Sequence, residues 1–135
     1  MRVAVIDDDR SVCNALRRLF ASANVSAHIF GSGREFLAAQ PALLDCIVLD
    51  LKMPGIGGLE LLRILKSCRV ETPVIIITAS DTATARVDCA RLGAFALLAK
   101  PFQEQDLFSA IKAAIAGSAE TNATALSNGA GDGRL

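Results

Sequence analysis

The chain has 135 residues, of which 52% are hydrophobic, and its 14 basic side chains balance its 14 acidic ones. This length corresponds to one domain with a single core, and the neutral charge provides no electrostatic footprint for nucleic acid or an anionic membrane. The longest apolar run, at residues 74–77, has the length of a strand and not of a membrane span. The acidic start MRVAVIDDD is too short for a signal peptide. Four cysteines without a C-x-x-C pair are typical of core or helix positions and indicate a reducing cytoplasm.

Short β-branched segments alternate with helical patterns along the chain, which is typical of βαβ units and a parallel sheet. Strands are predicted over residues 2–6, 26–30, 46–49, 74–78 and 95–99. Helices are predicted over residues 12–23, with Ser11 as the cap, and over residues 34–39, 59–67, 82–92 and 103–116. Right-handed crossovers then give an α/β fold, a doubly wound five-stranded parallel sheet of order 2-1-3-4-5 with five helices.

The hydrophobic pattern is lost from Gly117 onward, where the sequence becomes small, polar and rich in glycine. Residues 1–116 are therefore predicted to form the domain, and residues 117–135 a flexible tail or linker. Two architectures stay open: a stand-alone domain, or a domain separated from a DNA-binding output domain. Nothing after residue 116 has the pattern expected of an output domain.

Polar side chains gather where the predicted strands end, and ligands bind at this edge of such a sheet. The first strand leads into Asp7 and Asp8, and the third, fourth and fifth deliver Asp50, Thr78 and Lys100. Clustered carboxylates raise one another's pKa values unless a cation joins them. Mg²⁺ favours one or two carboxylates together with phosphate oxygens. The pattern thus predicts a magnesium-assisted phosphoryl site in which Asp50 attacks in line and forms an aspartyl phosphate.

Each of these elements has a simpler interpretation on its own. An acidic run before a helix can serve only as its cap, and an aspartate after a strand is often a turn residue. A threonine that ends an apolar strand and a Lys-Pro pair after another are equally ordinary. The prediction depends on all four features falling on successive strand ends.

The segments at these strand ends resemble the signature segments of response-regulator receiver domains of bacterial two-component systems, which have a flavodoxin-like fold. The resemblance spans about residues 2–116, and its segments are Ile6-Asp7-Asp8, Leu49-Asp50-Leu51-Lys52-Met53-Pro54-Gly55, Gly58-Leu59-Glu60-Leu61-Leu62, Ile77-Thr78-Ala79, Gly93-Ala94 and Lys100-Pro101-Phe102.

The resemblance implies a role for each matching residue. Asp50 corresponds to the phosphoacceptor, Asp8 to a direct Mg²⁺ ligand, and Asp7 to an acid that often acts through water. Lys52 stands where a backbone carbonyl completes the metal shell. The resemblance further implies that Thr78 turns toward the phosphoryl group and that Lys100 pairs with the same group. It also implies that the Lys100–Pro101 bond is cis.

One position departs from the family pattern. Many receivers carry an aromatic residue three positions before the lysine, as part of the conformational switch, and here that residue is Leu97. A leucine has no polar tip to hold either position. Phe95 is expected to point to the same face of the sheet as Leu97 because strand side chains alternate.

Taken together, the sequence predicts a phosphorylation-activated signalling switch rather than an enzyme with a separate substrate. A sensor histidine kinase or histidine phosphotransfer protein is the expected phosphoryl donor, and residues 82–116 the face that changes its partner binding, with a homodimer as one outcome. A haloacid dehalogenase-type phosphatase is disfavoured because Lys52 stands where it needs an acid. A nucleotide-binding module is disfavoured because the sequence lacks the glycine motif of such a module. A receiver that is never phosphorylated is disfavoured because every residue of the phosphorylation site is present.

Overall fold

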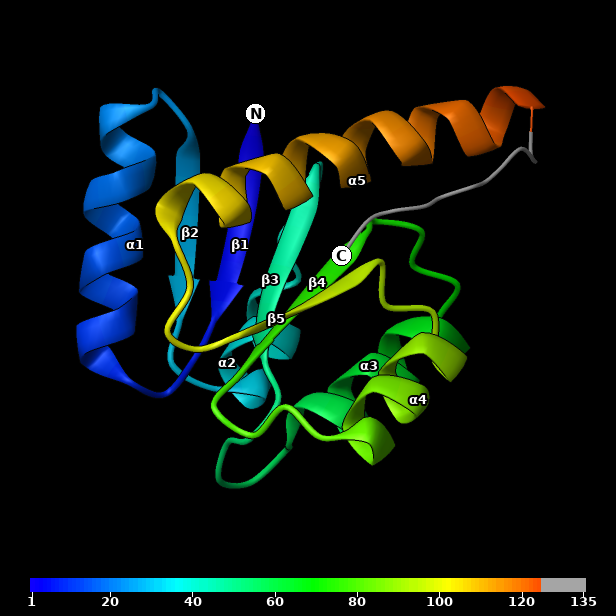
Figure 1. Cartoon of the computed structure of the whole chain (residues 1–135), viewed down its shortest axis with the longest axis horizontal. Helices are drawn as coiled ribbons and strands as arrows, with labels where there is room; N and C mark the ends of the chain where they lie inside the picture. The colour runs from blue at the N-terminus through cyan, green and yellow to red at the C-terminus, as the bar shows by residue number, and fades with distance from the viewer. Residues whose placement is uncertain (125–135) are drawn as a thin grey trace.

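A five-stranded parallel sheet forms the centre of the molecule, in a computed structural model that describes the backbone of residues 1–124 and the side chains of residues 1–117. The strands lie side by side in the order β2-β1-β3-β4-β5, and all neighbours are parallel (Figure 1). Their bounds are β1 Arg2–Ile6, β2 Ser26–Phe30, β3 Cys46–Asp50, β4 Val74–Thr78 and β5 Ala96–Ala99. The predicted fold class and strand order are confirmed.

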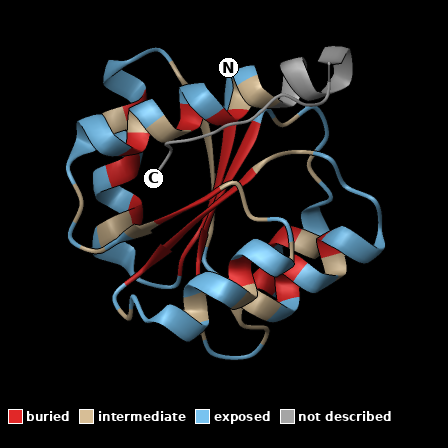
Figure 2. Cartoon of the chain, turned by 45° about the vertical axis from the view of Figure 1, so that its right-hand side comes forward, coloured by how far each residue is buried: buried red, intermediate tan, exposed pale blue. Residues whose placement is uncertain are grey.

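Five helices cover the two faces of the sheet. One face carries α1 (Arg10–Ser22) and α5 (Glu104–Thr124), and the other carries α2 (Gly33–Ala39), α3 (Gly58–Ser67) and α4 (Ala83–Arg91). The buried residues are concentrated in the strands, between the two helical layers (Figure 2). β3 and β4 are buried along their whole length because both faces are covered, which explains their continuous apolar sequence.

The first helix begins earlier than predicted. Its cap is Asp9, whose side chain accepts hydrogen bonds from the N–H groups of Ser11 and Val12 at 2.9 and 3.4 Å. Ser11 lies inside the helix, so its predicted role as the cap is wrong. A carboxylate is favoured over a hydroxyl here because it also meets the positive end of the helix dipole.

Phe95 and Leu97 lie on opposite faces of the sheet, which corrects the expectation that they share one. Leu97 packs in the core beneath α2, α3 and α4, whereas Phe95 packs in the core beneath α1 and α5. β5 begins only at Ala96. Strict alternation of side chains therefore does not extend back to residue 95.

The last helix continues past its predicted end at residue 116 to Thr124. The hydrophobic pattern is lost from Gly117 onward, but a glycine ends a helix mainly by adopting positive φ, and Gly55 and Gly93 are the glycines of the described residues that do so. The rest of the predicted tail, residues 125–135, lies outside the described residues, and the domain boundary at 116 remains a prediction. Within the described part of the chain, no helix combines the length and apolarity needed to cross a membrane.

Candidate functional site

The predicted site residues converge at the carboxyl edge of the sheet because the strands are parallel and in register. Leu49, just before Asp50, pairs with Ile6, just before Asp7. On the other side of β3, Asp50 itself pairs with Ile77. The side chains that follow the strands thus meet at one edge, as predicted.

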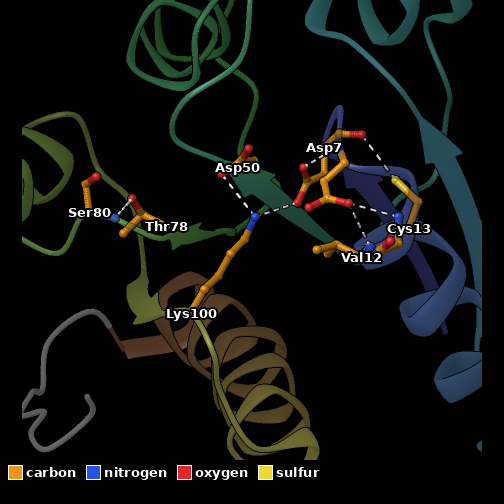
Figure 3. Close-up of polar contacts among 9 residues, drawn as sticks. Asp7, Val12, Cys13, Asp50, Thr78, Ser80 and Lys100 are labelled. Carbon is orange, nitrogen blue, oxygen red and sulfur yellow. Dashed lines mark hydrogen bonds and ion pairs between the residues drawn. The ribbon is translucent and has the colours of Figure 1, made fainter.

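Lys100 joins two of the acids. Its Nζ lies 2.9 Å from Oδ2 of Asp7 and 3.5 Å from Oδ1 of Asp50, between the two carboxylates (Figure 3). Asp7 is fully buried and Asp50 is 6% exposed, so these charges interact in a partly desolvated environment. The Lys100–Pro101 peptide bond is cis, as expected.

The charges in this cluster shift one another's pKa values. Burial, together with the negative charge of Asp7, raises the pKa of Asp50 to about 6, although Lys100 opposes both effects. Burial alone lowers the pKa of Lys100, but the hydrogen bond and charge of Asp7, together with Asp50, bring it above its ordinary value. The cluster therefore holds more negative charge than its one ammonium neutralises.

Three carboxylates could hold a divalent cation. Asp7, Asp8 and Asp50 each offer one oxygen, and these oxygens lie within 4.8 Å of one another. Asp8 is exposed, so the cluster opens to solvent on its side. Hard oxygen donors with room for water are what Mg²⁺ prefers, and the excess negative charge favours a cation. The residues present fit a magnesium ion.

Lys52 does not join this cluster through its side chain. It lies exposed in the loop after β3, two residues beyond Asp50. The expectation for Lys52 concerned its backbone carbonyl alone and remains a prediction.

Thr78 lies at the same edge but its hydroxyl is engaged elsewhere. Its side chain is fully buried, and Oγ1 accepts a hydrogen bond from the N–H of Ser80 at 2.9 Å. Its carbonyl accepts a bond from the N–H of Lys100 at 2.7 Å, which ties β4 to the residue after β5. Figure 3 shows Thr78 and Ser80 on one side of Asp50, with Lys100 reaching toward Asp7 on the other.

Several supporting residues were missed from the sequence. The carboxylate of Asp7 accepts a bond from the N–H of Asp9 at 2.9 Å, and its carbonyl accepts one from the thiol of Cys13 at 3.1 Å. The first contact joins an aspartate to the N–H two residues on, a pattern that aspartate often forms, so it was predictable. The Cys13 contact had no sequence signal.

Gly58 allows the backbone to pass close to the site. A Cβ added there would lie 2.5 Å from the carbonyl oxygen of Asp50 and 2.7 Å from Cα of Leu51. Its N–H donates to the carbonyl of Leu51 at 2.9 Å. The start of α3 is thereby packed directly against the end of β3, which fixes the backbone of Asp50.

Leu97 fills the position of the predicted switch residue. It is 6% exposed and belongs to the same core cluster as Cys89 of α4. The leucine therefore lies inward in this structure. Its movement on activation remains a prediction.

The chain is thus an α/β domain with a doubly wound sheet and an acidic, lysine-bridged site at its carboxyl edge. The family model described as the response regulator receiver domain matches residues 3–112. The chain belongs to this family, whose members are signal-transduction switches of two-component systems.

Named relatives agree with this assignment. The transcriptional regulatory protein FixJ of Bradyrhizobium diazoefficiens is 36% identical over 114 residues, which cover 84% of this chain and 56% of FixJ. The solved structure of the response regulator StyR matches with a TM-score of 0.82 at 36% identity, over 90% of this chain and 62% of that one. The structure titled FixJ-N gives a TM-score of 0.78 at 29% identity, over 85% and 93%. The chain thus spans about half the length of the curated relatives it matches.

Proposed function

We propose that Asp50 is the phosphoacceptor of this receiver domain and takes its phosphoryl group from the phosphohistidine of a sensor histidine kinase or a histidine phosphotransfer protein. The proposal is carried by the position of Asp50, which ends β3 with Nζ of Lys100 at 3.5 Å and two further carboxylates within reach of a shared cation. A nucleophile, a cation site and a fixed ammonium are the parts that phosphoryl transfer requires.

The transfer itself needs little from the protein beyond position and charge. A carboxylate oxygen of Asp50 forms a bond to phosphorus, and the bond from phosphorus to the histidine nitrogen breaks with its electron pair remaining on the imidazole. Asp7, Asp8, Asp50 and the carbonyl of Lys52 would hold Mg²⁺, which supplies neutralisation of the phosphoryl oxygens. The domain catalyses its own phosphorylation and dephosphorylation and no further reaction.

Lys100 and Thr78 would report the new charge. The ammonium of Lys100 already lies between two acids and needs only a small shift to pair with a phosphoryl oxygen on Asp50. Thr78 would have to leave the N–H of Ser80 to reach the same group. Its movement, with Leu97 beside α4, would alter the face formed by residues 82–116 and change partner binding.

The partners and the compartment belong to the same proposal. Homodimerisation through the face of residues 82–116 is one consequence of phosphorylation, and this chain does not itself bind nucleic acid. A cytoplasmic location is supported by the four cysteines, all of which are free thiols.

Acetyl phosphate with Mg²⁺ tests the assignment directly. Wild type should gain one phosphoryl group by intact mass, Asp50→Asn should gain none, and the matched control Asp106→Asn, an exposed acid of α5, should behave as wild type. Chelation of the metal should abolish the adduct on wild type. An adduct that persists in Asp50→Asn, or none on wild type, would remove the proposal.

A second variant separates phosphorylation from its transmission. Lys100→Ala should still bind the metal, but phosphorylation should no longer move the NMR signals of residues 82–116 as it does in wild type. Equal shifts in both proteins would show that the ammonium does not report the phosphoryl charge.

A further inference from the structure

A bidentate ion pair closes the loop between β4 and α4. Nε of Arg86 donates to Oδ1 of Asp81 at 2.7 Å, and its second guanidinium nitrogen donates to Oδ2 at 2.8 Å. This hydrogen bonding raises the pKa of Arg86 and lowers the pKa of Asp81. Two parallel bonds fix the geometry of the loop in a way that one bond does not.

The same loop holds the hydroxyl of Thr78. Residues 79–82 connect β4 to α4, and the N–H of Ser80 within them donates to Oγ1 of Thr78. Asp81 follows directly, and Thr82 caps α4 by accepting a bond from the N–H of Ala85 at 3.0 Å. The ion pair therefore ties the residue next to Ser80 to the body of the helix.

The apolar contacts of α4 with the core are few, and Ala85 is only partly buried against it. Cys89 is the one buried residue of this helix, and at the far end Nζ of Lys66 donates to the carbonyl of Arg91 at 3.2 Å. With so few apolar contacts, polar contacts at the start of the helix have a larger share in positioning the loop.

We propose that the Asp81–Arg86 ion pair is a positioning device that keeps the Thr78 hydroxyl on the N–H of Ser80 and so limits how readily Thr78 turns toward Asp50. This inference rests on the proposed function, in which Thr78 responds to a phosphoryl group on Asp50. The two residues act through the loop and touch neither the acceptor nor the metal ligands.

The direction of the effect follows from the contacts. Turning Oγ1 toward Asp50 breaks its bond to the N–H of Ser80, so a displacement of the loop that carries Ser80 weakens this bond and favours the turn. The ion pair opposes that movement because it holds Asp81 in place. Loss of the pair should loosen the loop in the unphosphorylated protein and favour the turned position of Thr78.

The first measurement needs no phosphorylation. Arg86→Gln keeps a residue of similar helix propensity and should increase the solvent exchange of the Ser80 amide, followed by NMR in the metal-free protein, by about two- to fourfold, the range that an exposed ion pair supports. Arg91→Gln removes the same charge from the same helix and should leave this rate unchanged. The exchanged pair, Asp81→Arg with Arg86→Asp, should restore the slow rate. Equal rates in Arg86→Gln and wild type, or an equal increase in Arg91→Gln, would overturn the proposal.

The second measurement follows the response to acetyl phosphate and Mg²⁺. Arg86→Gln should be phosphorylated about two- to fourfold faster than wild type, and the difference should shrink at about 1 M salt because the pair is exposed and therefore screened. If wild type formed its adduct normally and Arg86→Gln were phosphorylated at the same rate, the positioning role of the ion pair would be contradicted, but the assignment of Asp50 as the phosphoacceptor would not. If wild type formed no adduct while Ser80 exchange still responded to Arg86→Gln, the phosphoacceptor assignment would be wrong and the mechanical role of the ion pair would stand.

Discussion

The helices α4 and α5 flank β5 on opposite faces of the sheet but are attached to it in very different ways. α5 places Leu107, Ile111 and Ala114 in the core, each fully buried. α4 buries Cys89 alone, and its Val87 is 52% exposed. α5 is therefore part of the stable core of the domain, whereas α4 can shift with a small loss of free energy.

This difference lies next to the functional site. The loop that carries Ser80 leads from Thr78 directly into α4, and the loop that carries Lys100 leads into α5. A charge placed on Asp50 thus acts on a loosely packed helix on one side and a firmly packed one on the other. A signal should be expressed mainly as a displacement of α4, with α5 as the reference against which it moves.

Removal of a core contact of α5 should have the largest effect on stability. Ile111→Ala leaves a cavity beneath the helix and should lower the free energy of unfolding by about 3–4 kcal/mol, measured by urea denaturation with one transition. Val87→Ala, on the exposed surface of α4, should change it by less than about 0.5 kcal/mol. Similar losses in the two variants would contradict the contrast between the helices.

Much of the fold was predictable because the sequence repeats one local pattern. Each buried strand is a short apolar segment, and the apolar residues of most helices recur at helical spacing. Parallel pairing of the strands then brings Asp7, Asp50 and Lys100 to one edge of the sheet, and the conformations of the loops do not alter this. The placement of these three side chains needed only strand order, which the crossover rule supplies.

The features that were missed depend on side-chain direction and on the exact ends of elements. Asp9 rather than Ser11 caps α1, and Phe95 faces away from Leu97, because each element begins one or two residues from where its pattern suggests. The Asp81–Arg86 pair joins a loop to a helix five residues on, and charge composition alone does not specify such a contact. Local patterns locate a residue on an element but do not determine its partner.

Gly58 tests whether the whole face that carries α4 is loosely packed. Gly58→Ala puts a Cβ against the backbone of Asp50 and Leu51, which cannot move aside as a flexible side chain would. We expect a loss of about 2–3 kcal/mol in the free energy of unfolding and displaced NMR signals at Asp50. A matched change at Gly57, whose added Cβ would meet nothing nearer than 3.9 Å, should cost clearly less. If the two glycines tolerate alanine equally, the contact between α3 and β3 is as loose as that of α4.

Asp50→Asn tests whether the charged site destabilises the folded protein, in contrast to the core contacts of α5, which stabilise it. The carboxyl has a pKa of about 6 in the folded protein against 3.8 ordinarily, so between these values the folded state binds more protons than the unfolded state. Stability of the metal-free protein should therefore fall as pH rises from about 4 to about 6.

At pH 7 the neutral amide of Asp50→Asn avoids the loss of stability that ionisation of the buried carboxyl causes. The metal-free Asp50→Asn variant should be more stable than wild type by about 1–2 kcal/mol, since a full conversion at 1.36 kcal/mol per pKa unit gives about 3 and the amide loses the contact with Lys100. Urea denaturation across this pH range measures both the gain and the missing slope. Mg²⁺ should then stabilise wild type more than the variant; a variant less stable than wild type without metal would mean that Lys100 outweighs burial.

The smallest effect is expected for the one buried residue of α4. Cys89→Ala removes the one buried side chain of this helix and should lower the global free energy of unfolding by only about 1 kcal/mol, whereas the exposed Cys68→Ala should leave it unchanged. Amide exchange should report more than global stability does, because α4 opens on its own: its amides should exchange faster in Cys89→Ala while those of α5 keep their wild-type rates. Faster exchange of equal size in both helices would mean that α4 and α5 unfold as one unit, and α4 could then not move against α5 as a separate element.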